Sequence, residues 1–390
     1  MEQTPNALRK HVVLLGSTNA GKSTLFNALT GQDRAIVSPT PGTTTDPVRA
    51  PMELIPFGPI VLVDTAGLGD RSGLGEARIR RTKNAVRSAD AALYVADARD
   101  FSEEDYRAFQ AERLPHLLVF NRWRDGAQRQ ALHRVHPDAL FLGADAEISD
   151  LRGRLAALLS EQEPDDLPLL GDLLPAGSHV VLVTPIDSAA PKGRLILPQV
   201  QVLRECLDCG ICATVCREHE LETALHALRR VDMVVTDSQA FAYVDARTPK
   251  EIPLTSFSML LARQKGDFAQ LLAGARALDT LPDGARVLML EGCTHNQTHE
   301  DIGRVKLPAL LKKKRGAALT FTFCAGYDFP DDLTGYALAI QCGNCMIHRR
   351  EAIHRLERFA SAGIPVTNYG MALAWGAGIL ARASAPFATG

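Results

Sequence analysis

Short apolar runs alternate with longer amphipathic stretches along most of this chain, a pattern typical of an α/β protein built on parallel sheets. In the N-terminal part, the pattern predicts strands at residues 11–15, 60–63 and 117–120 and a helix at residues 150–160. The acidic, proline-bearing segment that follows, residues 161–166, indicates a linker. We therefore predict a first domain over residues 1–163.

The alternation resumes after this linker and continues through the rest of the chain. Strands are predicted at residues 179–183, 212–216 and 231–235, which indicates a small α/β domain over residues 164–267. Beyond it, strands are predicted at residues 286–290, 318–323, 336–340 and 364–367, and helices at residues 346–360 and 371–381. The expected fold class is α/β with three domains, the last of them over residues 268–390.

The composition is that of an ordinary globular protein, because 46% of the 390 residues are hydrophobic and the net charge is −2. This balance favours neither a nucleic-acid nor an acidic-membrane partner. No apolar stretch reaches the roughly eighteen residues of a membrane-spanning helix, and residues 1–10 lack the apolar core of a signal peptide. We therefore expect a cytoplasmic, reducing location, in which the eight cysteines are ligands, redox groups or core residues.

The first predicted strand leads into the GxxxxGKS sequence of a phosphate-binding loop, and a helical stretch follows it. The glycines let backbone N–H groups surround the phosphates at a helix N-terminus. Lys22 neutralises the β- and γ-phosphate oxygens, and the Ser23 hydroxyl reaches Mg²⁺. Nucleotide binding is therefore assigned to Gly16, Asn19, Ala20, Gly21, Lys22, Ser23 and Thr24.

A turn-rich, polar segment at residues 41–46 has the composition of a mobile switch. One of its threonines can complete the Mg²⁺ shell when a γ-phosphate is present. We choose Thr44 before Thr43 and count it, with Lys22, among the catalytic groups.

A strand-end aspartate follows the apolar run at residues 60–63. Asp64 is placed to act on Mg²⁺, and the N–H of Gly67 can sense the γ-phosphate. Leu68 comes next, where a glutamine would orient the attacking water. We therefore expect slow intrinsic hydrolysis or water positioned by other means.

These motifs resemble the TrmE-Era-EngA branch of the translation-factor-like GTPases, which implies GTP as the nucleotide. In that branch the asparagine matched by Asn19 is associated with a K⁺ ion that stands in for an arginine finger. The resemblance therefore implies K⁺-stimulated hydrolysis with Asn19 as a catalytic group. The Asn-Lys-x-Asp motif that reads the base is altered here, because Arg124 occupies the position of its aspartate. The expected preference for guanine is thereby weakened, although Asp125, one residue later, could reach the base if the loop bulges. We therefore count Asp125 with Asn121 among the nucleotide-binding residues.

Cysteines follow strands in the third predicted domain. Cys293 follows its first strand and Cys342 its third, with Cys345 close behind. Because ligands gather beyond the carboxyl ends of parallel strands, we expect these loops to converge on one crevice. Three thiolates suit zinc or an iron–sulfur cluster better than hard cations. Cys324, after the second strand, is expected to be a core or supporting residue.

The motifs Cys-x-His at residues 293–295 and Cys-x-x-Cys at residues 342–345, behind a GTPase-type domain, resemble the HydF family. Members of that family are GTPases that serve as scaffolds in assembly of the [FeFe]-hydrogenase active site. The resemblance covers essentially the whole chain. It implies a central dimerisation domain, a homodimer, and a [4Fe–4S] cluster bound by the three cysteines. It further implies that the chain carries a transient diiron unit, with the maturases HydE and HydG and the apo-hydrogenase HydA as partners.

The fourth ligand of such a cluster stays open. Gln341 stands where the family motif has a histidine, which excludes an imidazole from that position. The candidates are His295, His299 and Glu300, in the short stretch after Cys293, or an exchangeable position open to solvent or to an incoming cluster.

A second run of cysteines allows another interpretation. It has the CxxCxxCxxxC spacing of bacterial ferredoxins, which would make the chain an electron carrier with a second cluster. Alternatively, these side chains are small hydrophobic residues of a helix–turn–strand unit whose strand is buried. The residues concerned are Cys206, Cys209, Cys212 and Cys216.

A third function is a regulatory GTPase of the tRNA-modification or ribosome-assembly type. In that case the C-terminal cysteines and His295 would hold a structural zinc ion in a Cys₃His tetrahedron. The near-neutral charge argues against RNA binding. Cluster assembly with GTP hydrolysis is therefore our first hypothesis.

Overall fold

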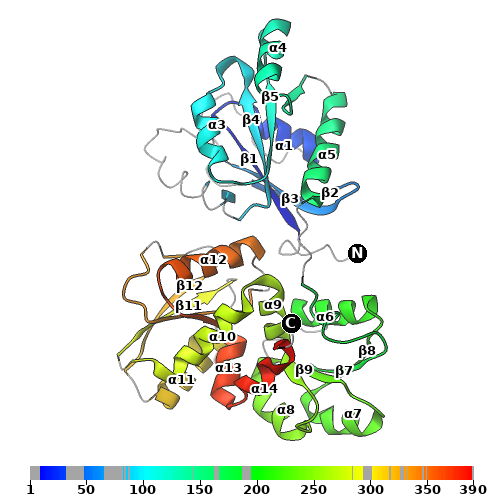
Figure 1. Cartoon of the computed structure of the whole chain (residues 1–390), viewed down its shortest axis with the longest axis vertical. Coiled ribbons are helices and arrows are strands. Elements are labelled where there is room, and N and C mark those ends of the chain that lie inside the picture. Colours follow the sequence, from blue (N-terminus) through cyan, green and yellow to red (C-terminus); the bar gives the residue numbers. More distant parts are fainter. Residues whose placement is uncertain are drawn as a thin grey trace. The chain divides into compact units, whose positions relative to one another are not determined.

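The computed structural model describes residues 9–31, 48–65, 82, 85–86, 88–143, 145–161, 167–186, 195–282, 284–292, 301–315, 318–325, 329–330, 332–344, 347 and 349–388. The chain divides into two compact units, residues 1–165 and residues 166–390 (Figure 1). None of the helices within the described ranges is long and apolar enough to cross a membrane.

The N-terminal unit is built on a six-stranded sheet with the order β2-β3-β1-β4-β5-β6. All neighbouring strands are parallel except β2 and β3, which pair antiparallel. The strands are β1 (Lys10–Leu15), β2 (Val48–Leu54), β3 (Gly58–Asp64), β4 (Ala91–Asp97), β5 (His116–Asn121) and β6 (Leu140–Leu142). Within the residues that the structure describes, the helices of this unit include α1 (Lys22–Thr30), α3 (Glu103–Gln110), α4 (Gly126–Val135) and α5 (Asp145–Ser160).

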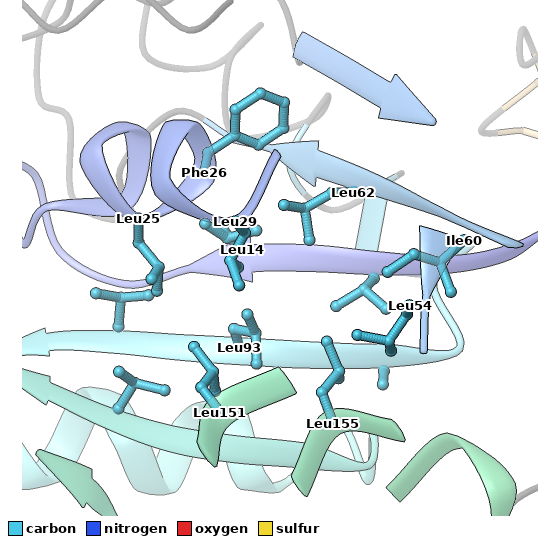
Figure 2. Packing of buried hydrophobic residues seen from close by; sticks show 14 of the residues in the cluster. Leu14, Leu25, Phe26, Leu29, Leu54, Ile60, Leu62, Leu93, Leu151 and Leu155 are labelled. Carbon is cyan, nitrogen blue, oxygen red and sulfur yellow. The ribbon is translucent and has the colours of Figure 1, made fainter. Parts of the chain in front are cut away.

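Two apolar layers cover the faces of this sheet. On one face, Leu25 and Phe26 of α1 and Leu151 of α5 pack against strand residues that include Leu14 and Leu93 (Figure 2). On the other face, aromatic side chains of α3 pack against β4 and β5. Because both faces are covered, β1 and β4 are almost continuously apolar, as expected of central parallel strands.

The C-terminal unit contains two four-stranded sheets, and every strand pair in both is parallel. The first has the order β10-β9-β7-β8 and the second the order β12-β11-β13-β14. The strands of the first are β7 (His179–Val183), β8 (Cys212–Cys216), β9 (Met233–Thr236) and β10 (Leu254–Ser256). Those of the second are β11 (Arg286–Glu291), β12 (Thr320–Ala325), β13 (Leu338–Gln341) and β14 (Val366–Asn368).

Helices of the C-terminal unit bind the two sheets into one body. Met259 of α9 and Phe241 of α8 share an apolar core with Leu288 and Val366 of the second sheet. The helices are α6 (Leu197–Asp208), α7 (Leu221–Ala227), α8 (Phe241–Arg247), α9 (Phe257–Lys265), α10 (Phe268–Ala277), α11 (Leu307–Arg315), α12 (Arg349–Ser361), α13 (Tyr369–Ala377) and α14 (Leu380–Ser384). The predicted boundary near residue 267 is thus crossed by a common core.

A glutamate side chain fixes the first residues of the C-terminal unit. Glu205 on α6 accepts hydrogen bonds from the backbone N–H groups of Leu169, Leu170 and Gly171, at 2.7 to 3.0 Å. Charge-assisted bonds of this kind are about twice as strong as neutral ones. The segment after the predicted linker is therefore fixed to the first sheet's helical layer.

Three sequence-based expectations need correction. The helix predicted at residues 371–381 is two helices, because Gly378 adopts a left-handed conformation with φ of 77° and ends α13. Cys324 lies inside β12 and not after it. The strand β8, expected to be buried, is an edge strand with Cys212 exposed, since it pairs with β7 alone within its sheet.

Candidate functional site

The phosphate-binding loop connects β1 to α1. Gly16 has φ of 134°, and a Cβ there would lie 1.9 Å from the carbonyl oxygen of Val95 in β4. Only glycine fits this approach. Gly21 has φ of 93° and precedes the first turn of α1. The loop thus leaves the N-terminus of α1 open toward an anion, as the sequence motif predicts.

Lys22 is buried in this loop. Its ammonium donates hydrogen bonds to the carbonyl oxygens of Gly16 and Ser17, at 3.1 and 2.8 Å. Burial lowers the pKa of Lys22 to about 8, although the nearby Asp64 carboxylate acts in the opposite direction. A phosphate group would replace the two carbonyl oxygens and supply the missing negative charge.

Asp64 and Ser23 form the part of the site that suits a hard cation. The Ser23 hydroxyl donates to Asp64 Oδ2 at 2.7 Å. Asp64 Oδ1 is buried and has no hydrogen-bond partner among the described residues. Burial raises the pKa of Asp64, opposed by the Ser23 hydrogen bond and by Lys22. A buried carboxylate oxygen without a partner, next to a hydroxyl, fits a Mg²⁺ ion.

The loop after β5 lies against the phosphate-binding loop. Asn121 Nδ2 donates to the carbonyl oxygen of Ala20 at 3.4 Å, and Arg122 Nη1 to that of Asn19 at 2.9 Å. Asp125 caps α4 instead, because its Oδ1 accepts the N–H of Gln128 at 2.8 Å. Contact of Asp125 with a base stays a prediction. Thr44 and Gly67 lie outside the described residues, and Thr24 is an exposed residue of α1.

Cys342 follows the carboxyl end of β13, at the edge where β11 also ends. Its Sγ accepts hydrogen bonds from the N–H groups of Gly292, at 2.9 Å, and Asn344, at 3.4 Å. A Cβ on Gly292 would lie 3.1 Å from this sulfur, so glycine permits the close approach. Backbone N–H groups directed at a cysteine sulfur are the donors that tune iron–sulfur clusters.

Lys265, at the end of α9, is hydrogen-bonded to the loop that carries Cys342. It is 6% exposed, and its ammonium donates to the carbonyl oxygens of Asn344, at 3.1 Å, and Ile347, at 3.3 Å. Asn344 has φ of 52°, which directs its N–H to the sulfur and its carbonyl to the lysine. The helix α9, which packs on the first sheet of this unit, therefore contributes a residue to the cysteine loop of the second sheet.

Gln341 faces a small cavity beside Lys265. The cavity has a volume of about 10 Å³ and is lined also by Cys342 and Asn368. Gln341 is 3% exposed, and its Oε1 has no hydrogen-bond partner among the described residues. Apolar side chains such as Leu261 and Leu271 complete the lining, and the volume is about that of a single water molecule.

Three polar residues near Cys342 were not among the predicted site residues. Glu291, the last residue of β11, forms a bidentate ion pair with Arg304, with N···O distances of 3.0 Å. Burial, together with the charges of Cys342 and Glu291, raises the pKa of Tyr369, whose hydroxyl lacks a partner among the described residues. In the sequence, Glu291 follows the apolar run at residues 287–290 and Tyr369 follows the predicted strand at residues 364–367, whereas no comparable signal marks Arg304.

The ferredoxin-like cysteines do not converge. Cys206 is a core residue of α6 and Cys216 is buried at the end of β8, whereas Cys212 is exposed. Burial raises the pKa of Cys206 and that of Cys216 to about 11, which disfavours the thiolates that a metal needs. Within the described part of the chain, no group of three or more His, Cys, Asp or Glu residues could hold a metal ion.

The other predicted cluster ligands lie outside the described residues. They are Cys293, His295, His299, Glu300 and Cys345. Cys293 directly follows Gly292 in the sequence, and Cys345 directly follows Asn344. Both donors to Cys342 Sγ are therefore sequence neighbours of the two remaining cysteines.

Family models match nearly the whole of the C-terminal unit. Residues 169–266 match the hydrogen maturase F dimerization domain, and residues 269–386 match the hydrogen maturase F tetramerization domain. This chain belongs to the hydrogen maturase F (HydF) family. Residues 11–122 match a third model, described as a 50S ribosome-binding GTPase. The predicted family, the α/β fold with three domains and the GTPase domain are confirmed.

Curated relatives resemble part of this chain. The chain is 50% identical over 99 residues to the tRNA modification GTPase MnmE of Methylorubrum populi, which covers 24% of this chain and 22% of that protein. It is 38% identical over 133 residues to the GTPase Der of Acidithiobacillus ferrooxidans, covering 31% of this chain and 29% of that protein. The chain thus spans less than a third of the length of either relative. The regulatory GTPase with a structural zinc is not favoured, because the HydF models match the remaining domains.

Solved structures show weaker likeness. A complex of Era with MgGDPNP and a 16S ribosomal RNA fragment is 19% identical, with a TM-score of 0.34, and covers 53% of this chain and 91% of that one. The G domain of the T. maritima iron transporter FeoB is 22% identical, with a TM-score of 0.29, and covers 38% and 99%. Both TM-scores are below 0.5, so neither likeness bears on the function of this chain.

The pKa of Lys22 predicts a pH-dependent nucleotide affinity. Bound phosphate favours the charged ammonium, whereas in the free protein its pKa is about 8. Below pH 8 the lysine is already charged, and above it a proton must be taken up on binding. We therefore expect the affinity for Mg²⁺-GDP to fall several-fold, at most about tenfold, between pH 7 and pH 9. Calorimetry at pH 8.5 in two buffers of different ionisation enthalpy measures the proton uptake; its absence would contradict this assignment.

Proposed function

We propose that this chain is a GTP-hydrolysing scaffold that binds a [4Fe–4S] cluster and delivers a diiron precursor to apo-[FeFe]-hydrogenase. Membership of the HydF family supports this role, as does the coexistence of a phosphate-binding loop with a separate cysteine loop. The cluster ligands are Cys293, Cys342 and Cys345.

One observation carries the proposal. The sulfur of Cys342 accepts N–H groups from Gly292 and from Asn344, each of which directly precedes another predicted ligand cysteine. Residues fifty positions apart are therefore brought to a single sulfur by the parallel pairing of β11 with β13. This arrangement supports one three-cysteine site in preference to three unrelated thiols.

The residues present fit an iron–sulfur cluster. Soft thiolate ligands and N–H donors to sulfur suit such a group, and the buried ammonium of Lys265 below the loop offsets negative charge. A bound cluster would supply an iron position that can accept an exchangeable ligand. The fourth ligand is then His295, His299, Glu300 or an incoming group, whereas Gln341 is one of the residues that line the cavity beside Lys265.

The nucleotide part of the function rests on the phosphate-binding loop. Lys22 binds the phosphates, and Ser23, Asp64 and Thr44 hold Mg²⁺. Hydrolysis is slow, since Leu68 replaces the residue that would orient water. We place K⁺ at Asn19, whose backbone adopts a left-handed conformation with φ of 66° at the exposed rim of the loop.

Self-association follows from the two matched domain types, and we place a homodimer contact at the edge of the first sheet. Exposed large apolar side chains gather there: Val215 on β8 is 44% exposed, and Leu207 on α6 is 71% exposed. An open edge strand presents unpaired backbone groups that a second copy can cover. HydE, HydG and HydA are the proposed further partners, and the cytoplasm, where thiols stay reduced, is the proposed location.

The cluster assignment predicts the iron content of cysteine variants. Anaerobically reconstituted protein should hold about four iron atoms per chain and give an EPR signal on reduction. Cys342→Ala should lose most of this iron, because it removes the central thiolate. Cys209→Ala, a cysteine outside the site, is the matched control and should keep it. Tetrahedral zinc with no iron–sulfur absorption or EPR signal in the wild type would falsify the proposal.

Potassium should stimulate hydrolysis through Asn19. We expect GTP turnover to be several-fold faster in K⁺ than in Na⁺ buffer, because a cation at Asn19 stabilises charge that develops between the phosphates. Asn19→Ala should reduce the rate in K⁺ to the rate in Na⁺. Equal wild-type rates in the two buffers would count against this role.

The dimer contact predicts the effect of a charge on β8. Val215→Glu should halve the particle mass measured by light scattering, because a buried unpaired carboxylate at an interface is strongly unfavourable. Val135→Glu, on α4 of the other unit, replaces a residue that is also exposed, at 66%, and should leave the mass unchanged. An unaltered mass in Val215→Glu would show that the copies meet elsewhere.

A further inference from the structure

The loop after β5, residues 121–125, is held at two places by hydrogen bonds. Its first half is tied to the phosphate-binding loop, since Asn121 bonds Ala20 and Arg122 bonds Asn19. Its second half is tied to α4, where Asp125 is the N-cap. Asn121 and Arg122 thus hold the loop beside the phosphate-binding loop, next to the expected position of the nucleotide base. Arg124 and Asp125 are then the side chains whose chemistry decides how the base is recognised.

Guanine differs from hypoxanthine by its 2-amino group. Its N1–H and 2-amino group are two donors on one edge, and a carboxylate with two available oxygens accepts them as a pair. A site that makes such hydrogen bonds rejects an analogue that lacks one of the groups. The spacing from Asn121 puts residue 124 where that carboxylate is needed.

Residue 124 is an arginine, which has five donors and no acceptor. Its Nη2 donates to the carbonyl oxygen of Arg99 at 3.3 Å, and its backbone N–H donates to Gln128 Oε1 at 2.7 Å. A guanidinium there cannot accept from N1–H or from the 2-amino group. The acceptor pair that would select guanine is therefore replaced by donors.

Two carboxylates near this loop, those of Asp125 and Asp97, are engaged elsewhere. Asp125 Oδ1 accepts the N–H of Gln128 at 2.8 Å, with backbone angles φ −156° and ψ 177° that suit an N-cap. Both oxygens of Asp97, at the end of β4, accept from the Arg99 side chain, at 2.9 and 2.6 Å. Neither residue presents two available oxygens to a base.

We infer that this nucleotide site binds guanine and hypoxanthine nucleotides with similar affinity, and that Arg124 is the residue responsible. The ligand class is 6-oxopurine nucleoside di- and triphosphates, held through the phosphates and the purine ring. The inference rests on the nucleotide-binding part of the proposed function and is independent of the cluster.

Calorimetry of the full chain with Mg²⁺-GDP and Mg²⁺-IDP tests this inference. The two wild-type dissociation constants should agree within about threefold, since neither Asp97 nor Asp125 offers a carboxylate pair to the 2-amino group. Arg124→Asp introduces the acceptor and should make GDP at least tenfold tighter than IDP. Arg124→Ala removes the arginine without adding an acceptor, and its two constants should stay within about threefold.

Asp125→Asn separates this inference from the alternative that Asp125 reads the base. Asparagine still caps a helix, so the fold of α4 is kept. The GDP-to-IDP ratio should be unchanged in this variant. A wild-type preference for GDP of tenfold or more would overturn the inference, and its loss in Asp125→Asn would assign the reading to Asp125. If neither nucleotide bound, the nucleotide part of the proposed function would fail as well.

Discussion

The parallel pairing of β11 with β13 is the constraint on which the cysteine site depends. In this register Leu290 lies beside Gln341, and the N–H of Cys342 donates to the Leu290 carbonyl oxygen at 2.8 Å. The chain leaves β11 immediately afterwards, which brings the N–H of Gly292 to the Cys342 sulfur. A shift by one residue would turn Cys342 to the other face and separate these groups.

Support for this loop comes from a different part of the chain. Lys265 ends α9, a helix that belongs to the first sheet's layer, yet its ammonium is buried under Asn344 and Ile347. A shared apolar core around Met259 holds α9 in place. Loss of packing between the two sheets would therefore disturb the cysteine loop, even though no ligand lies in the first sheet among the residues described.

In the phosphate-binding loop, two buried side chains are electrostatically unfavourable in their charged forms until ligands bind. Lys22 and Asp64 are both buried. Burial lowers the pKa of Lys22 and raises the pKa of Asp64, and each shift favours the neutral form of the side chain. Phosphate places negative charge next to Lys22, and Mg²⁺ places positive charge next to Asp64. These interactions replace the hydration that the two charged groups lost on folding. At Cys342 the sulfur accepts backbone N–H groups, and the Lys265 ammonium is bonded to carbonyl oxygens of the same loop.

The sequence by itself determined the α/β class, the phosphate-binding loop and the family, because these depend on the local spacing of residues. The patterns that carried them are glycines at tight turns, Lys22 at the start of a helix and Cys342 at the end of a strand. It could not show that Lys265 reaches the cysteine loop, that Asp125 caps α4, or that Cys206 and Cys212 face different surroundings. Those features depend on strand order and helix packing, which bring together residues far apart in the chain. Only the tertiary structure decided them, since side-chain direction at a given position follows from the neighbours that burial supplies.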